Sequence, residues 1–255
     1  MSLFSLTADI NKAYFEYSQG RYISASKILH RLIEGNTEKK EFSSELAVAY
    51  FMRGVILNRL GNYEKAIKSF LQVKLKERAL SGLSYELAQA LYAVGNLDDA
   101  KKEFLKSVKE RYQITPSIYY LAVIYKAKKN YRKAFYFLDK ILKLKYNANN
   151  IKQMAWTQIA EIHLEQLNKS RSKPSFVEKV VLPSYQKALH FAPDSELATF
   201  IQTRIHNVKV RYAIYDKGKD QKHKNYTKKI NGLNSRRKKD AKFKDKLPNR
   251  KSRKR

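Results

Sequence analysis

The strongest constraint on the fold of this chain is a short phrase that returns with a fixed period. It reads GNYEKAIKSF from Gly61, GNLDDAKKEF from Gly95 and KNYRKAFYFL from Lys129, so that successive copies begin 34 residues apart. An earlier and looser copy, GRYISASKIL, begins 41 residues before the first of these. Self-similarity at a fixed period of about 20–50 residues is typical of arrays in which one supersecondary unit is stacked on the next.

Three columns of residues within the repeat predict a pair of antiparallel helices in each unit. The central column is always alanine: Ala25, Ala66, Ala100 and Ala134. A small residue stands 12 positions before each alanine: Ala13, Gly54, Ala88 and Ala122. A large apolar residue stands 4 positions after it: Leu29, Phe70, Phe104 and Leu138. Small residues on facing helices let the helix axes approach, and the large residue fills the space beside them.

These units resemble the tetratricopeptide repeat (TPR) family, whose unit is a helix–turn–helix of the same period. The resemblance is carried by Gly54, Leu57, Gly61, Tyr63, Ala66 and Phe70 and by their counterparts in the next two units. A fifth, degenerate copy spans Ala155–Leu164 and Ser184–Leu197, with an inserted loop between its halves. The resemblance covers residues 6–215 and implies an all-α solenoid of about five helix-turn-helix units, closed by a capping helix.

Two features are expected near the end of this array: an irregular helix at Pro183 and a capping helix after the last unit. Pro183 falls inside the expected second helix of the fifth unit, where its missing N–H predicts a kink or a late start. The capping helix is expected over Ser195–Tyr215, with one apolar face turned to the last unit. That face comprises Leu197, Phe200, Ile201, Ile205, Val208 and Tyr212.

The first helices of such an array line its concave face, and we predict the binding site there. One row of this face is aromatic, with Phe51, Tyr85 and Tyr119 in successive units. Tyrosine and arginine are favoured anchors because they bury a large area at modest entropic cost. The predicted groove comprises Tyr14, Tyr17, Phe51, Asn58, Arg59, Tyr85, Gln89, Tyr92, Tyr119 and Lys126. For any one of these aromatic side chains, packing between adjacent first helices is the alternative interpretation.

The resemblance also bears on the kind of ligand. Some members of the family hold a C-terminal carboxylate with a Lys and an Asn, and the corresponding first-unit positions here are Ile10 and Tyr14. Neither side chain replaces a Lys or an Asn as a carboxylate clamp. An extended or helical segment of another protein, laid along an aromatic groove, is the partner that this composition favours.

The charge of the chain is strongly positive, with 53 Lys and Arg against 23 Asp and Glu, a net charge of +30. Residues 216–255 are the densest part and hold too few apolar residues to fold alone, so we expect a basic, disordered tail. Its candidate anion-binding residues are Arg236, Arg237, Lys238, Lys239, Arg250, Lys251, Arg253, Lys254 and Arg255. Three interpretations stay open: a solvated tail, binding of nucleic acid or ribosomes through phosphates, and contact with an anionic membrane surface or an acidic protein.

Signals of catalysis are absent from the sequence. The chain contains no cysteine, its five histidines lack the HExxH spacing, and no glycine-rich loop precedes a Lys-Ser or Lys-Thr pair. We therefore expect a protein that is not an enzyme and has no cofactor, metal or small-molecule substrate. The longest apolar run, Ile118–Tyr125, is too short for a membrane span of about 20 residues, and Asp9 interrupts the apolar N-terminus. We expect a cytoplasmic protein, with peripheral attachment to a membrane as the alternative.

These observations favour a protein–protein interaction scaffold, an adaptor or a chaperone-like stabiliser that binds a partner segment in its aromatic groove. One alternative is a nucleic-acid or ribosome-associated factor that uses the basic tail. The other is a peripheral membrane scaffold of an envelope assembly.

Overall fold

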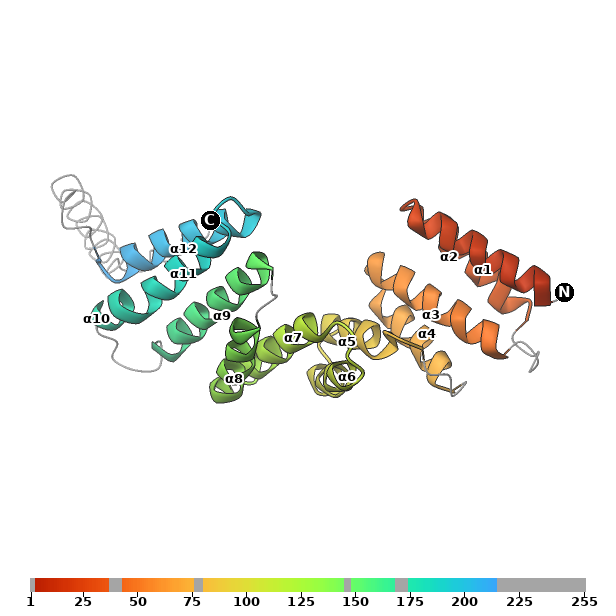
Figure 1. Cartoon of the computed structure of the whole chain (residues 1–255), viewed down its shortest axis with the longest axis horizontal. Helices are drawn as coiled ribbons and strands as arrows, with labels where there is room; N and C mark the ends of the chain where they lie inside the picture. The colour runs from red at the N-terminus through yellow and green to blue at the C-terminus, as the bar shows by residue number, and fades with distance from the viewer. Residues whose placement is uncertain (1–2, 37–42, 76–79, 145–147, 168–173, 215–255) are drawn as a thin grey trace, which may run out of the picture.

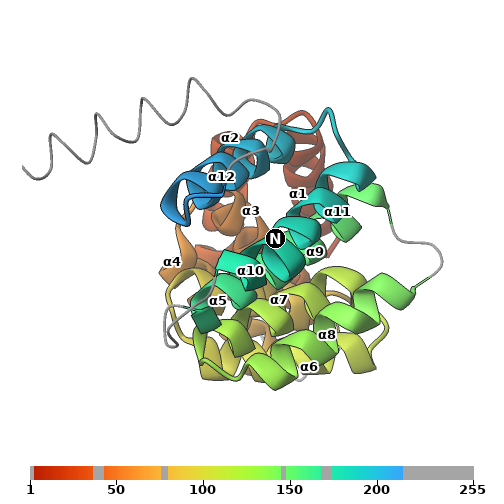
Figure 2. The same ribbon diagram turned by 90° about the vertical axis from the view of Figure 1, so that its left-hand side faces the viewer.

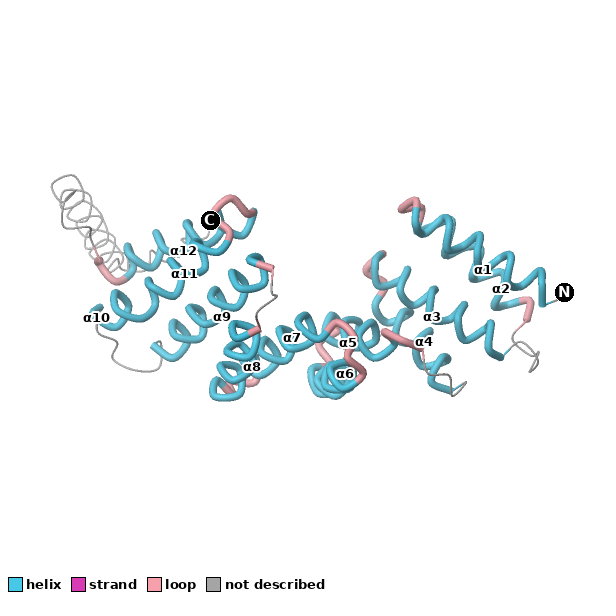
Figure 3. The backbone as a smooth tube through the Cα atoms, in the orientation of Figure 1, coloured by secondary structure: helices cyan, strands magenta, loops and turns pink. Residues whose placement is uncertain are grey.

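The computed structural model describes residues 3–36, 43–75, 80–144, 148–167 and 174–214, and within these ranges every regular element is a helix (Figure 3). The helices follow one another as stacked pairs along a curved path (Figure 1). Turned by 90°, the pairs lie around a common axis rather than in a flat stack (Figure 2). The expected all-α solenoid of about five units is confirmed. The expected boundary between the repeats and the tail at residues 215 and 216 lies outside the described residues and stays a prediction.

The first four pairs follow the repeat. They are α1 (Leu3–Ser18) with α2 (Tyr22–Glu34), α3 (Ser43–Arg59) with α4 (Tyr63–Leu75), α5 (Leu83–Ala93) with α6 (Leu97–Lys109), and α7 (Ile114–Ala127) with α8 (Tyr131–Lys143). The fifth pairs α9 (Asn149–Leu167) with a composite helix made of α10 (Pro174–Phe176), a π-helical segment (Val177–Val181) and α11 (Leu182–Phe191). The last helix, α12 (Glu196–Arg211), packs on α11. Each element contacts mainly its neighbours along the chain, as expected for a solenoid.

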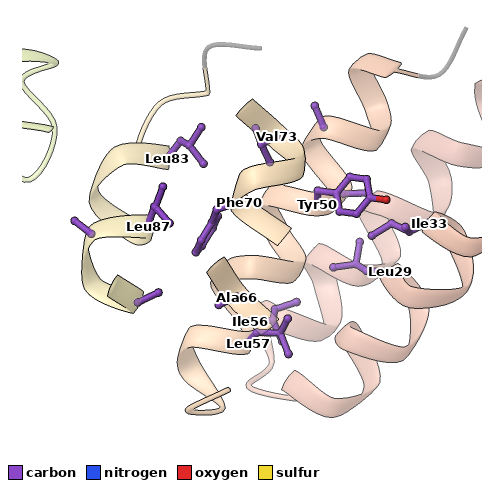
Figure 4. Close-up of a cluster of buried hydrophobic side chains, with 14 of the residues drawn as sticks. Leu29, Ile33, Tyr50, Ile56, Leu57, Ala66, Phe70, Val73, Leu83 and Leu87 are labelled. Carbon is purple, nitrogen blue, oxygen red and sulfur yellow. The ribbon is translucent and has the colours of Figure 1, made fainter. Parts of the chain in front are cut away.

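The three columns of the repeat form the contact between the two helices of each pair. All four central alanines are 0% exposed, and the small and large columns are buried as well. Gly54 shows why one column must stay small, since a Cβ built there would lie 2.4 Å from the ring of Phe70. In Figure 4 the Phe70 side chain points from α4 toward Leu87 of α5. The large residue therefore fills the space within one unit and also joins that unit to the next.

In the second, third and fourth units, the turn between the two helices is formed by a residue in the left-handed conformation followed by an asparagine. Gly61 and Gly95 adopt φ values of +73° and +81°, which glycine reaches without penalty at a helix C-terminus. Lys129 takes the same place in the fourth unit with φ +58°, so a side chain occupies a left-handed position there. The following asparagine begins the second helix: the side chain of Asn96 accepts a hydrogen bond from the backbone N–H of Asp99. The Gly-Asn pair thus ends one helix and caps the next.

The fifth unit is irregular at Pro183, as expected. The regular helix α11 begins only at Leu182, with Pro183 in its first turn, but the helical path before it already starts at Pro174. The π segment precedes the proline, and the N–H of Leu182 bonds to the carbonyl of Val177, five residues back. Wider turns of this kind accommodate local irregularity in a helix without ending it.

The capping helix lies as expected, with one correction. Ser195 is its N-cap and accepts a hydrogen bond from the N–H of Ala198. Ile201 and Val208 are buried, but Phe200 is 54% exposed. One helical residue corresponds to about 100° of rotation, so Phe200 lies at the edge of the apolar stripe that Ile201 centres. The placement of Phe200 on the packed face was therefore wrong.

Candidate functional site

The first helices form one continuous surface, here called the first-helix face, and α5 and α7 lie on the inside of the curve with α6 and α8 outside (Figure 1). In the first two units this face contains an apolar pocket of about 130 Å³. The pocket is lined by Tyr14, Tyr17, Phe51, Met52, Val55 and Ile56. Tyr14 is 62% exposed, and its ring stands free at the rim. Three predicted groove residues, Tyr14, Tyr17 and Phe51, are thus brought together.

Next to this pocket, a buried carboxylate joins the second unit to the third. The side-chain amide of Asn58 donates to the backbone carbonyl of Glu86 at 2.9 Å and to its Oε2 at 3.3 Å. Burial raises the pKa of Glu86, while the Asn58 hydrogen bond and the charge of Arg59 oppose this shift. Arg59 itself is exposed, and a hydrogen bond with Tyr17 raises its pKa. The sequence analysis missed Glu86, although a lone carboxylate among the apolar residues of this helix was a visible signal.

The predicted aromatic residues of the third unit, Tyr85 and Tyr92, also pack against other rings of the protein. Gln89 donates from Nε2 to the hydroxyl of Tyr85 at 3.0 Å. The Tyr85 ring lies 6.1 Å from that of Phe104, and burial raises the pKa of Tyr85 to about 12. Tyr92 likewise lies 5.1 Å from Tyr120 of the next unit. Both tyrosines are half-buried, so packing within the unit (Tyr85) and against the next unit (Tyr92) accounts for part of each side chain.

Farther along, the predicted residues Tyr119 and Lys126 are held by a glutamine that the sequence analysis missed. Gln158 of α9 donates from Nε2 to the Tyr119 hydroxyl at 3.2 Å. Its Oε1 accepts from Nζ of Lys126 at 3.1 Å. Lys126 also forms an ion pair with Glu165 at 3.3 Å. The ammonium group is therefore occupied by partners within the protein.

The last part of the first-helix face is a closed polar cluster. Glu161 of α9 accepts two hydrogen bonds from Arg204 of α12, at 2.7 and 2.8 Å, and one from the hydroxyl of Tyr185 at 2.5 Å. Burial disfavours the charged form of Glu161, but the hydrogen bonds from Arg204 and Tyr185 outweigh it and lower the pKa of this carboxyl. The cluster fastens the cap to the fifth unit.

The described residues offer no constellation for chemistry on a metal. Among them, no group of three or more His, Asp and Glu side chains is placed to hold a metal ion. In the same ranges, no helix combines the length and the apolar composition that crossing a membrane requires. The nine predicted anion-binding residues between Arg236 and Arg255 lie outside the described residues.

Comparison with known proteins identifies one repeat by its sequence and the fold by its structure. A sequence model of the tetratricopeptide repeat matches residues 47–74. No curated protein matches the chain by sequence. Among solved structures, YrrB, a TPR protein with an unusual peptide-binding site, is similar with a TM-score of 0.58 and 16% identity, over 76% of this chain and 90% of its own. MamA is similar with a TM-score of 0.55 and 13% identity, over 70% of this chain and 93% of its own. At these identities the structures show a shared fold.

Proposed function

We propose that this chain is a protein-binding scaffold, because residues 47–74 match the tetratricopeptide repeat and its solenoid fold is shared with TPR proteins of known structure. The partner is a segment of another protein that lies along the first-helix face. An apolar side chain of this segment enters the pocket between α1 and α3, and the rest of the segment follows the aromatic row toward α5. The protein acts by equilibrium binding, as an adaptor or a chaperone-like stabiliser that covers an apolar surface of its partner.

The observation that carries this proposal is the apolar pocket with an exposed tyrosine at its rim. Its volume of about 130 Å³ is close to that of an engineered apolar cavity, about 150 Å³, that accepts benzene. A leucine-sized or ring-sized side chain therefore fits. Tyr14, at 62% exposed, is available to close over such a side chain. Exposed aromatic residues beside a pocket are the usual centres of binding energy at interfaces.

A second candidate function rests on charge alone. Residues 216–255 carry 18 Lys and Arg against 4 Asp and Glu, and a segment of this kind binds phosphates with a steep salt dependence. The tail would then hold nucleic acid, ribosomes or an anionic membrane surface while the repeats bind protein. This function is separable from the first, because it depends on other residues.

The test is a comparative capture experiment with the full chain. Tyr14→Ser removes an exposed ring at the pocket, and Tyr136→Ser removes an exposed ring (54%) on the second helix α8. Bound proteins are quantified by mass spectrometry after nuclease treatment at moderate salt. We expect proteins that bind the parent and Tyr136→Ser to bind Tyr14→Ser at least about tenfold less.

Two outcomes would overturn the proposal. Equal capture by Tyr14→Ser and the parent would place the interface away from the pocket. Loss of all bound proteins on nuclease treatment would favour the function of the basic tail. Circular dichroism of both variants should match the parent, since neither ring contributes much to the core.

A further inference from the structure

The outer side of the second unit carries a pocket whose chemistry differs from that of the first-helix face. Its volume is about 590 Å³. It is lined by Tyr50 and Arg53 of α3 and by Lys65, Lys68, Ser69, Leu71, Gln72 and Leu75 of α4. Leu71 and Leu75 are 46% and 74% exposed. Three cationic side chains and two exposed leucines therefore share one pocket.

Arg53 occupies a position at which the next two units bury an aliphatic residue. The residues 34 and 68 positions later are Leu87 and Leu121, which are 2% and 0% exposed. The Nε of Arg53 is buried and has no hydrogen-bond partner. A buried donor without an acceptor destabilises the fold, so this arginine is poorly explained as a packing residue. Arg53 also lines the pocket, so its guanidinium group is placed to meet an acceptor supplied from outside.

The two lysines of the pocket also differ from their counterparts in the next unit. Lys102 stands 34 residues after Lys68, and its ammonium group pairs with Asp99 at 2.9 Å. Asp99 in turn stands 34 residues after Lys65, so the third unit has a carboxylate where the second has a cation. Within the described part of the chain, Arg53, Lys65 and Lys68 form no ion pair. The second unit thus presents unpaired positive charge at a place where the next unit neutralises it.

We propose that this pocket binds an acidic segment of a second protein, separately from the groove on the first-helix face. Carboxylates of the segment meet Arg53, Lys65 and Lys68, and one apolar side chain lies against Leu71 and Leu75. A guanidinium group matches a carboxylate with two parallel hydrogen bonds. The leucines favour a protein segment over a nucleic-acid backbone, because the backbone has no apolar side chain to place on them. A scaffold with both surfaces holds two protein segments at once.

The test measures binding of a short fluorescent peptide of Glu, Leu and Ser to the full-length protein by fluorescence anisotropy. Arg53→Leu installs the residue of the later units, and Lys65→Glu inverts one charge at the third position of α4. We expect each variant to weaken binding at least about tenfold, since each leaves carboxylates of the peptide without a partner. Arg53→Lys keeps the charge but loses the planar donors, so its loss should be intermediate.

The matched control is Lys133→Glu. Lys133 stands 68 residues after Lys65, at the third position of α8, and is exposed. This variant has the same net charge as Lys65→Glu and keeps residues 216–255, so any attraction of the peptide to the basic tail is equal in both. We expect it to bind within about twofold of the parent.

Three results would overturn the proposal. Unchanged binding by Arg53→Leu and Lys65→Glu would show that the pocket is not the site. A loss in Lys133→Glu as large as that in Lys65→Glu would assign the binding to overall charge. Displacement of the peptide by inorganic phosphate, but not by acetate at the same ionic strength, would assign the pocket to phosphoryl groups instead of carboxylates. Unfolding curves recorded for each variant separate loss of binding from loss of fold.

Discussion

In the first two units the first-helix face is aromatic and open, whereas in the last unit it is polar and occupied by its own contacts. Tyr14 is 62% exposed at the rim of the apolar pocket. The side chain of Glu161 is 15% exposed and holds Arg204 with two hydrogen bonds. The same helix position in a repeat can therefore serve a partner at one end of an array and stabilise the array at the other. The difference makes the two ends separable by experiment.

The largest effect on stability should come from removing Arg204, which holds Glu161 in the polar cluster of the last unit. Arg204→Ala leaves the Glu161 carboxylate half-buried without its cation. A fully buried pair costs about 3–5 kcal/mol when one partner is removed, and we expect about 2 kcal/mol here because the Arg204 side chain is 41% exposed. Trp156 is the single tryptophan and packs in the same region, so its fluorescence reports on this end during urea unfolding.

The expected result is a tryptophan transition at lower urea, with a smaller change in the circular dichroism of the whole array. Arg132→Ala, which removes an exposed arginine of α8, is the control and should leave both transitions in place. If both signals shift together by the same amount, the two ends do not unfold separately. The structural difference between the ends would then not correspond to a difference in their stability.

A smaller effect is expected from crowding the second unit. Gly54→Ala places a Cβ 2.4 Å from the ring of Phe70, which is 0% exposed and cannot move aside. We expect a net loss of about 1 kcal/mol, because overpacking costs about 1–3 kcal/mol while alanine favours the helix by about 1 kcal/mol over glycine. The measurement is thermal unfolding by circular dichroism. Adding Phe70→Leu, the residue type of Leu29 and Leu138 in the same column, should recover part of the loss; no recovery would argue against the clash.

Two carboxylates, Glu86 in the third unit and Glu161 in the fifth, should also respond to acid with opposite signs. Burial raises the pKa of Glu86, so its contribution to stability is largest below the ordinary value of 4.5 and is lost as pH rises through the folded pKa. The pKa of Glu161 is lowered, so its contribution is present above 4.5 and is lost as pH falls through the folded pKa. Between neutral pH and 4.5 the parent should gain stability relative to Glu86→Gln.

Below pH 4.5, the urea concentration at which the Trp156 fluorescence changes should fall in the parent. The same midpoint should hardly change further in Arg204→Ala. Urea unfolding at a series of pH values, followed by fluorescence and circular dichroism, measures both responses. A parent and a Glu86→Gln variant with parallel pH profiles would show that this carboxyl does not titrate differently in the folded state.

The smallest effect concerns a single turn. Lys129 holds φ +58°, a conformation that costs about 1–2 kcal/mol for residues other than glycine. Lys129→Gly should stabilise the fourth unit by about 0.5–1 kcal/mol, because the entropy of glycine in the unfolded chain offsets part of the gain. Gly95→Ala, at φ +81° and with no atom within 4 Å of the new Cβ, is the converse and should destabilise. Opposite shifts in melting temperature are the expected readout.

Sequence reasoning predicted the part of the molecule that depends on contacts within one unit. The buried alanines, the small and large columns and the turns all follow from spacing, because two helices joined by a short turn leave few ways to pack. Tyr14, Tyr17 and Phe51 were also expected on the face where the pocket lies.

The parts that escaped prediction depend on how one unit sits on the next. Asn58 reaches Glu86 across 28 residues, and Gln158 reaches Tyr119 across 39. Such pairs do not repeat, so no column of the sequence marks them. Pro183 marked the irregular point of the fifth unit, but a missing N–H does not indicate that the helical path before it continues as a π segment.

The π segment has a consequence for the register of side chains in the fifth unit. A helix closed by bonds over five residues holds one residue more than a regular turn, as the bond from Leu182 to Val177 shows. In a regular helix, one additional residue rotates every later side chain by about 100°. Val177, which begins the segment, and Tyr185, which follows it, are both fully buried. The wider turn therefore takes up the additional residue locally, and the helix keeps its contact with the core on both sides of that turn.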